Sequence, residues 1–270
     1  MLIMKENFAA YLRKESLSAN TIKSYLYTAN YYLAHYGGPT SENLLTYKGY
    51  LLERYKPRTV NLRIQAMNKY LEFLGEDKMQ LKFVKLQQKN FLENVISNAD
   101  YVFLKNTLKK NGIINGYFVV WYLAATGARV SELIQIKVED VDMGYIDLYT
   151  KCGKLRRLYI PKILREETVQ WLLNENRRSG YLFLNRHDDR ISTRGISQKL
   201  KAYAKKYGLD PKVVYPHSFR HRFAKNFLEK YSDIALLADL MGHESIETTR
   251  IYLRRTASEQ QELVDKIVTW

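Results

Sequence analysis

The first 75 residues alternate amphipathic stretches with strong helix-ending signals. Between Ser18 and Tyr36 apolar side chains recur at three- and four-residue spacing, and Gly37, Gly38 and Pro39 follow at once. The recurring positions are Ile22, Leu26, Ala29, Leu33 and Tyr36. This pattern predicts a helix that Ser18 caps, that buries one stripe and that ends before the glycines.

Three further helices are predicted in the same region. One covers residues 8–14, and a second, about residues 41–55, stops before Pro57, since the residue before a proline disfavours helical geometry. The third covers residues 58–74 and repeats apolar side chains at Val60, Ile64, Met67, Leu71 and Leu74. Four short helices with apolar stripes predict a small helical domain over residues 1–78.

Residues 79–96 carry many charges and glutamines with little periodicity, which predicts a linker. Residues 97–270 then form the predicted second domain. Its first helices are expected at 99–110 and 116–125. The period changes to two around Tyr145 to Tyr159, on both sides of a Lys-Cys-Gly-Lys turn, which predicts a β-hairpin. Six more helices are expected, at 163–176, 193–208, 218–231, 233–242, 246–255 and 259–270. The predicted fold class is therefore mainly α with a small β-hairpin, in two domains.

Charge adds an expectation about partners. Of 270 residues 46% are hydrophobic, enough for a buried core, and the formal net charge is +15. Both domains share the excess, with 14 basic and 8 acidic residues among the first 95. A polyanion, either nucleic acid or an acidic membrane surface, is the expected partner. No apolar run of membrane-spanning length and no basic amphipathic helix is present, which favours nucleic acid and predicts a cytoplasmic protein.

Several basic residues stand at positions that suit anion binding. Arg129 follows a turn at Gly127 and opens a predicted helix, where free backbone N–H groups also attract anions. His217 and Arg220 are three residues apart and share one helix face, and His243 follows the helix-ending Gly242. Each of these residues alone is also compatible with a structural role. Arg129, for example, could pair with nearby Glu132.

Taken together, the residues suit attack on a phosphodiester. Two arginines can neutralise the charge that grows on the phosphate, a histidine can accept a proton, and a lysine can donate one. Tyr252, nine residues after His243, supplies a nucleophile whose phenolate cationic neighbours can stabilise. The histidines lack cysteines or carboxylates at metal-ligand spacing, and no glycine-rich nucleotide-binding motif occurs, so neither a metal nor another cofactor is expected.

Four motifs in fixed order carry a family resemblance. They are "AATGARVSEL" at 124–133, the lysine-bearing hairpin, "PHSFRH" at 216–221 and "LMGHESIETTRIY" at 240–252. Together they resemble the tyrosine recombinase (phage integrase) family, in particular its compact Xer-like members. Residues 17–33 and 56–74 are similar to the SAM-like core-binding helices of that family. The resemblance therefore covers nearly the whole chain and implies a C-shaped clamp of two domains around duplex DNA.

The resemblance implies six catalytic residues: Arg129, Lys151, His217, Arg220, His243 and Tyr252. By this comparison the two arginines hold the scissile phosphate and His217 is the general base. Lys151 is the general acid to the 5′ hydroxyl, His243 orients the phosphate, and Tyr252 forms a 3′-phosphotyrosyl bond. Bond energy is thereby conserved while DNA strands are cleaved and rejoined.

The hairpin departs from the pattern of the family. It reads "TKCGKLRR", shorter at the turn than is usual, with Cys152 where a glycine is common. Lys151 aligns better, but Lys154 is close enough to be an alternative general acid. Cys152 is interpreted as an inert small residue and His221 as structural.

The resemblance also implies an assembly. Members act as a homotetramer on two DNA sites with inverted repeats, so this chain is expected to be a monomer until it meets DNA. The helix at 259–270, with Leu263, Ile267 and Trp270 on one face, is expected to dock into a neighbouring protomer, or otherwise onto its own domain. Integration, excision, inversion and dimer resolution all stay open. The alternative functions are a type IB topoisomerase-like enzyme and a non-catalytic DNA-binding relative.

Overall fold

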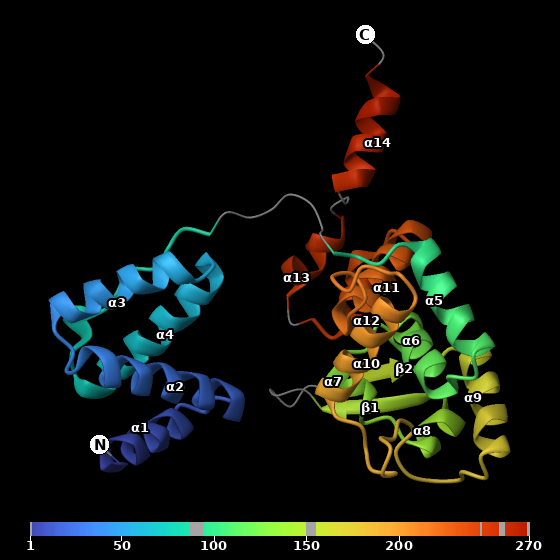
Figure 1. The fold of residues 1–270 in the computed structure, drawn as a ribbon, viewed down its shortest axis with the longest axis horizontal. Coiled ribbons are helices and arrows are strands. Elements are labelled where there is room, and N and C mark those ends of the chain that lie inside the picture. Colours follow the sequence, from blue (N-terminus) through green and yellow to red (C-terminus); the bar gives the residue numbers. More distant parts are fainter. Residues whose placement is uncertain (1, 87–93, 150–154, 244, 254–256, 269–270) are drawn as a thin grey trace. The chain divides into compact units, whose positions relative to one another are not determined.

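A computed structural model of the chain describes residues 2–86, 94–149, 155–243, 245–253 and 257–268. It contains two compact units, Met1–Gln88 and Lys89–Trp270, each with its own hydrophobic core (Figure 1). Helices dominate both units, and the described residues include one two-stranded antiparallel sheet. The predicted fold class is confirmed.

The first unit consists of the four helices that the hydrophobic pattern predicts. They are α1 (Leu2–Lys14), α2 (Ala19–Tyr36), α3 (Ser41–Arg54) and α4 (Pro57–Leu74), followed by a 3-10 turn, η1 (Asp77–Met79). Ser18 caps α2 as predicted, since its hydroxyl accepts a hydrogen bond from the Thr21 amide at 3.2 Å. Four of the five predicted apolar positions on α4 are fully buried, and Leu74 is partly buried.

The buried face of α2 differs from the prediction. Its buried residues are Tyr25, Thr28, Ala29 and Tyr32, so only Ala29 of the predicted stripe is fully buried, and the other four positions are partly buried against the core. The buried face of α2 is shifted toward its tyrosines, because a tyrosine ring buries a large apolar area while the hydroxyl keeps a polar partner. The ring of Tyr32 packs edge-on against Tyr47 with ring centroids 5.3 Å apart.

Two asparagines of α4 hold the segment that follows η1 in the first unit. The Asn68 side chain accepts from the amide of Leu81 at 2.8 Å and donates to its carbonyl at 3.0 Å. Asn61 makes the same pair of bonds with Val84, at 2.8 and 2.9 Å. Each asparagine thus satisfies both backbone groups of one residue. Residues 81–84, inside the segment expected to be a linker, therefore belong to the first unit.

The second unit is arranged around one buried helix, α6 (Ile114–Thr126). Its neighbours α5 (Asn98–Lys110), α9 (Lys162–Asn174), α10 (Thr193–Lys206) and α11 (Pro216–Lys230) pack on several sides of it. A helix that is covered all round needs an apolar sequence all round, and most of the side chains of α6 are buried. The shorter helices are α7 (Val130–Leu133), α8 (Val138–Met143), α12 (Ile234–Met241), α13 (Ile246–Arg250) and α14 (Ala257–Ile267).

The helix predicted over residues 246–255 is wrong in its length. Ser245 caps α13, which has only five residues, and a 3-10 turn, η2 (Ile251–Leu253), follows and carries Tyr252. Ile246, Thr248, Thr249 and Ile251 are β-branched, which weakens a helix that tertiary packing does not support. The helix that Arg129 was predicted to open begins at Val130, with Arg129 as its N-cap.

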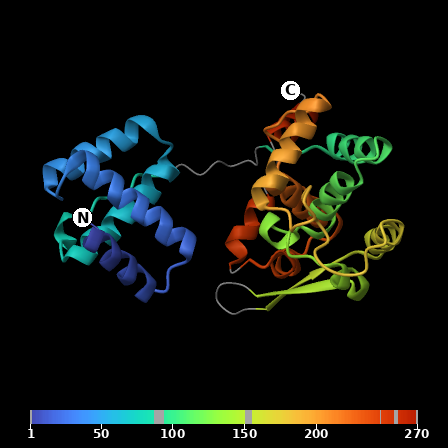
Figure 2. The same ribbon diagram turned by 60° about the horizontal axis from the view of Figure 1, so that its bottom comes forward.

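The predicted hairpin is confirmed. Strands β1 (Tyr145–Tyr149) and β2 (Leu155–Tyr159) pair antiparallel with Asp147 opposite Arg157, and Figure 2 shows them along one edge of the second unit. Lys151, Cys152 and Lys154 lie outside the described residues. No helix within the described ranges combines the length and the hydrophobicity needed to cross a bilayer.

Candidate active site

Arg129 sits on a tight turn between α6 and α7. Gly127 ends α6 with a φ of +61°, and a Cβ there would lie 2.5 Å from the Phe223 ring, so only glycine fits. The Arg129 amide donates to Glu132 Oε2 at 2.7 Å, and its Nη1 donates to Glu132 Oε1 at 2.8 Å. Glu132 thus caps α7 and fixes the guanidinium, which keeps 39% of its side-chain surface exposed.

Arg220, on α11, is 1% exposed. Its Nη1 donates to the Gly127 carbonyl at 2.5 Å, and its Nη2 donates to the Met241 carbonyl at 2.7 Å. Its Nε is buried and has no hydrogen-bond partner among the described residues. A buried guanidinium N–H without an acceptor is costly, so this atom is a donor that can accommodate an incoming anion.

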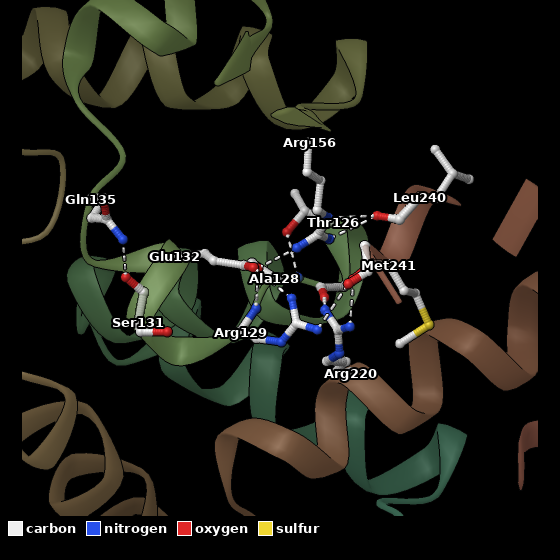
Figure 3. A network of polar contacts seen from close by, with 12 residues as sticks. Thr126, Ala128, Arg129, Ser131, Glu132, Gln135, Arg156, Arg220, Leu240 and Met241 are labelled. Carbon is white, nitrogen blue, oxygen red and sulfur yellow. Dashed lines mark hydrogen bonds and ion pairs between the residues drawn. The ribbon is translucent and has the colours of Figure 1, made fainter. Parts of the chain in front are cut away.

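The C-terminal end of α12 organises three arginines (Figure 3). The carbonyls of Leu240, Met241 and Gly242 accept hydrogen bonds from Arg156, Arg220 and Arg129, respectively. The last carbonyls of a helix have no partner within it and carry its partial negative charge, so cations suit this position. The turn at Gly242, with a φ of +59°, leaves room for the Arg156 side chain, which a Cβ there would meet.

Arg156 is the site residue that the sequence analysis missed. It lies on the buried face of β2 with 4% of its surface exposed, between the exposed residues Leu155 and Arg157. Its Nη1 donates to Glu132 Oε2 at 2.5 Å. The signal was present in the alternation of the hairpin, which places residue 156 on the same face as Leu158. A charged residue on the apolar face of a strand indicates a buried partner.

Glu132 is the anion that keeps these cations together. Burial opposes its ionisation, but the charge of Arg156 and the hydrogen bonds from Arg129 and Arg156 outweigh burial and lower the pKa of Glu132. Burial and, to a lesser degree, the charges of Arg129 and Arg156 lower the pKa of Arg220 to about 10, which leaves it charged at neutral pH. The pairing of Arg129 with Glu132 that the sequence suggested is present in the structure.

His217 and His221 lie one turn apart on α11. Their rings meet edge to face with centroids 4.5 Å apart, and His221 in turn lies 5.3 Å from the ring of Tyr252. Desolvation and the charges of Arg220 and Arg129 lower the pKa of His217, although it is the most exposed of the three site histidines. Burial and then His217 lower the pKa of His221 to about 4. The ring distance of 5.3 Å shows that His221 packs directly against Tyr252, the candidate nucleophile.

His243 follows Gly242 and reaches both α11 and α13. Arg220 Nη2 lies 3.0 Å from its Nε2, and Thr249 Oγ1 lies 2.7 Å from its Nδ1. Burial, followed by the charges of Arg220 and Arg129, lowers the pKa of His243 to about 4. The imidazole is therefore neutral at physiological pH.

Tyr252 is 5% exposed and packs with Ala224, Leu237 and Met241. Its ring lies 6.1 Å from that of His243, with an interplanar angle of 13°. Burial raises the pKa of Tyr252, while the charges of Arg220 and Arg129 lower it and offset part of that rise. The phenol is protonated at rest, beside the cations that can stabilise its phenolate.

The structure brings together five of the six predicted site residues, and the sixth, Lys151, lies outside the described residues. A pocket of about 460 Å³ opens beside them and is lined by Arg129, Glu132, Arg156 and His243. Within the described ranges, no three His, Cys, Asp or Glu side chains cluster as a metal site would require. The arrangement can hold an anion between arginines, next to a buried tyrosine.

The buried neutral histidines make stability sensitive to acid. His221 has a pKa of about 4 in the folded chain against an ordinary 6.5, so the unfolded chain takes up a proton first and stability falls as pH drops through this window. Asparagine does not titrate in this range. We therefore expect the free energy of unfolding to fall less steeply with decreasing pH in His221→Asn, by up to about 1.4 kcal/mol per pH unit. Urea unfolding between about pH 7 and about pH 5 measures this effect. His187→Asn, at an exposed histidine, is the control, and equal slopes in the two variants would contradict the assignment.

Comparison with known proteins gives consistent matches. The family model described as "Phage integrase family" matches residues 90–259. The chain is 33% identical to tyrosine recombinase XerA of Pyrococcus furiosus over 273 residues, which cover 97% of this chain and 92% of that one. It is 29% identical to tyrosine recombinase XerD of Listeria monocytogenes, with 93% of each chain covered.

Solved structures share the fold. A crystal structure of XerA recombinase matches with a TM-score of 0.56 and 24% identity, over 99% of this chain and 98% of that chain. The Tn1549 transposon integrase in complex with transposon right end DNA matches with a TM-score of 0.75 and 14% identity, over 98% and 99%. A lambda integrase dimer bound to a COC′ core site matches with a TM-score of 0.72 and 14% identity, over 93% and 76%.

Proposed function

Because this chain belongs to the phage integrase family and is a tyrosine-type site-specific DNA recombinase, we propose that Tyr252 is its nucleophile and that the arginines around it hold the scissile phosphate. Tyr252 Oη attacks phosphorus, an Oη–P bond forms, and the bond from phosphorus to the 5′ oxygen breaks. The product is a 3′-phosphotyrosyl intermediate and a free 5′ hydroxyl. A 5′ hydroxyl of another strand then reverses the step and joins the DNA.

The observation that carries the proposal is the Nε of Arg220, which is buried beside a buried tyrosine and has no hydrogen-bond partner in the part of the chain that the structure describes. In a phosphoryl-transfer transition state negative charge grows on the nonbridging oxygens, and preorganised N–H donors in a water-poor site stabilise that charge strongly. Arg220 offers such a donor while its other N–H groups hold the surrounding turns. Arg129, more exposed and fixed by Glu132, is the second phosphate ligand.

The proton transfers need a base and an acid. His217 is neutral, lies among these cations and is the most exposed site histidine, which suits it to accept the Tyr252 proton. His243 contributes a hydrogen bond to the phosphate. Lys151 donates the proton to the leaving 5′ oxygen, on the strength of the hairpin motif alone.

A nicked suicide duplex tests the proposed chemistry. The duplex is taken from the DNA next to the gene and carries a nick near the cleavage point, so that the short 5′ fragment diffuses away and traps the adduct. We expect a protein–DNA adduct that survives denaturation and whose DNA-linked peptide contains Tyr252. A bound duplex that never yields an adduct would contradict the proposal. Joining of the trapped strand to a second duplex, as opposed to resealing of the same strand only, separates a recombinase from a type IB topoisomerase-like enzyme.

The general acid can be identified with two lysine variants. We expect Lys151→Ala to slow cleavage by about 10² to 10⁴ on ordinary DNA, since protonation of the 5′ oxygen is lost. A substrate with sulfur in place of the bridging 5′ oxygen needs no proton on leaving and should restore the rate. Lys154→Ala is the matched control and should cleave both substrates normally. If rescue by sulfur occurs in Lys154→Ala instead, the assignment passes to Lys154.

We propose that the working form is a homotetramer on two DNA sites with inverted repeats, formed from monomers when DNA binds. Helix α14 supports this proposal, because Val264 and Ile267 are 51% and 58% exposed on it, and Val268, which follows its last residue, is 45% exposed. Such a row of apolar side chains suits docking into a neighbouring protomer. Trp270, which belongs to the same predicted face, lies outside the described residues. Since its substrate is intracellular DNA, the proposal also places the protein in the cytoplasm.

Deletion of residues 259–270 tests the docking. We expect the truncated chain to bind a single half-site with unchanged affinity, because the site residues and both cores remain. Pairing of two full sites, measured by native gel electrophoresis of differently sized duplexes, should fall sharply. Recombination at the rate of the complete chain would contradict docking between protomers.

A further inference from the structure

Both ring nitrogens of His243 have a partner. Nε2 lies 3.0 Å from Arg220 Nη2, and Nδ1 lies 2.7 Å from the hydroxyl of Thr249. Thr249, on α13, is fully buried with 0% exposure, and Arg220 is 1% exposed, so water does not compete for either bond. The imidazole is thus held from two sides, by α11 and by α13.

These two contacts fix which nitrogen carries the hydrogen. A guanidinium has only donors, so Nε2 must present its lone pair to Arg220. The hydrogen of the neutral ring then lies on Nδ1, which donates to the oxygen of Thr249. The opposite tautomer would point an N–H at an N–H of Arg220 and leave a repulsive contact. Which nitrogen is protonated is set by the bond that the other one makes.

This tautomer is the wrong one for a phosphate. Nonbridging phosphate oxygens only accept hydrogen bonds, and a lone pair on Nε2 would repel them. Nε2 can contact the phosphate only after it gains a proton. Because Nδ1 already donates to Thr249, the protonated ring then has an acceptor on each side, Thr249 Oγ1 and a phosphate oxygen. The same phosphate oxygen must also accept the Arg220 Nη2 hydrogen that Nε2 releases, while the other Nη2 hydrogen stays on the Met241 carbonyl.

We propose that Thr249 is a positioning residue that holds His243 in the Nδ1–H form, and that binding of the scissile phosphate draws one proton from solvent onto Nε2. The second half rests on the proposed function. The groups that face His243 are Arg220, His217 and His221 on α11, Arg129 at the start of α7, Arg156 on β2 and Tyr252 on η2. Three of them are arginines, whose positive charge keeps the ring neutral until the negative charge of the phosphate offsets it.

The first half is tested on the free protein. In the full chain labelled with ¹⁵N-histidine, two-bond nitrogen–proton correlations distinguish the two tautomers, and His243→Gln identifies the signals by their loss. We expect the Nδ1–H form in the wild type and in Thr249→Ser, which keeps the hydroxyl. Thr249→Val, of nearly the same shape, leaves Nδ1–H without its acceptor and should lower the share of that form, while Arg220 still favours a lone pair on Nε2. An Nε2–H ring in the wild type, or an unchanged ring in Thr249→Val, would overturn the role of Thr249.

The second half is tested with the duplex on which the wild type forms its adduct. Calorimetric binding by Tyr252→Phe in buffers of different ionisation enthalpy counts the protons taken up. We expect about one proton more than in Tyr252→Phe with His243→Gln, as linkage requires. Equal uptake in the two proteins would overturn the proton transfer. If the wild type forms no adduct on a bound duplex, the proposed function fails, while the tautomer assignment still stands or falls by the spectra of the free protein.

Discussion

Replacement of Tyr252 by phenylalanine is expected to abolish the covalent adduct while DNA binding is retained. The phenyl ring can keep the packing between the rings of His221 and His243, because only the hydroxyl is removed. The phosphate ligands Arg129 and Arg220 are unchanged, so affinity for a half-site should stay within about twofold. Without an attacking oxygen the phosphotyrosyl bond cannot form. Rate reductions on the order of 10⁶ are typical when a catalytic nucleophile is removed.

The measurement is adduct formation on the suicide duplex, together with a gel-shift titration of the same DNA. Tyr215→Phe is a matched control, since Tyr215 is a half-buried tyrosine at the N-cap of α11 next to the site. We expect Tyr215→Phe to form the adduct at a rate near that of the wild type. Adduct formed by Tyr252→Phe would show that another residue attacks the DNA.

Replacement of Arg220 by lysine is expected to slow cleavage by about 10³ with the chain still folded. Arg220 donates to the Gly127 carbonyl at 2.5 Å and to the Met241 carbonyl at 2.7 Å. It thereby links two turns that are 114 residues apart in the sequence. A lysine ammonium is a single point and cannot satisfy both carbonyls and also donate to a phosphate. The variant therefore keeps the charge but loses the fork of donors.

Single-turnover cleavage at saturating protein measures this loss without the contribution of affinity. Arg250→Lys is the control, because Arg250 lies close to Tyr252 in sequence but is exposed and pairs with Glu247 at 3.1 Å. An exposed pair of this kind contributes little, so its rate should stay within about twofold. Thermal unfolding of both variants shows whether the fold is kept. If Arg220→Lys cleaves at the wild-type rate, the buried guanidinium is not a phosphate ligand.

The helices of the first unit show how well the spacing of apolar residues predicts which positions are buried. The period of α4 predicted four of its fully buried positions correctly, because an apolar stripe at helical spacing has one way to face a core. On α2 the same rule found only one of the fully buried positions, Ala29, since the predicted stripe left out Tyr25 and Tyr32. Tyr25 and Tyr32 are in fact core residues, and only the packing of their rings against α3 and α4 could show this.

At the candidate active site, local motifs identified most of the residues but not all of their ion-pair partners. The motif around Arg129 predicted a guanidinium at a helix start, and Glu132 was correctly identified as its partner. The second guanidinium on Glu132, that of Arg156, was missed because it comes from a strand whose alternation was read only for its outward residues. A buried charge on a strand has meaning only once its partner is known.

The sequence by itself determined the order of the helices, the hairpin, the basic character of both units and the motifs that place this chain in its family. Those properties depend on neighbours within one helical turn or one strand pair, where spacing dictates contact. The tertiary structure alone decided that three arginines meet the last carbonyls of α12, that the buried Arg220 Nε has no acceptor among the described residues, and that the ring of His243 lies between Arg220 and Thr249. Arg129 and the Gly242 carbonyl, for example, are 113 residues apart in the sequence. A local pattern cannot predict this hydrogen bond, because the two groups meet only when the chain folds.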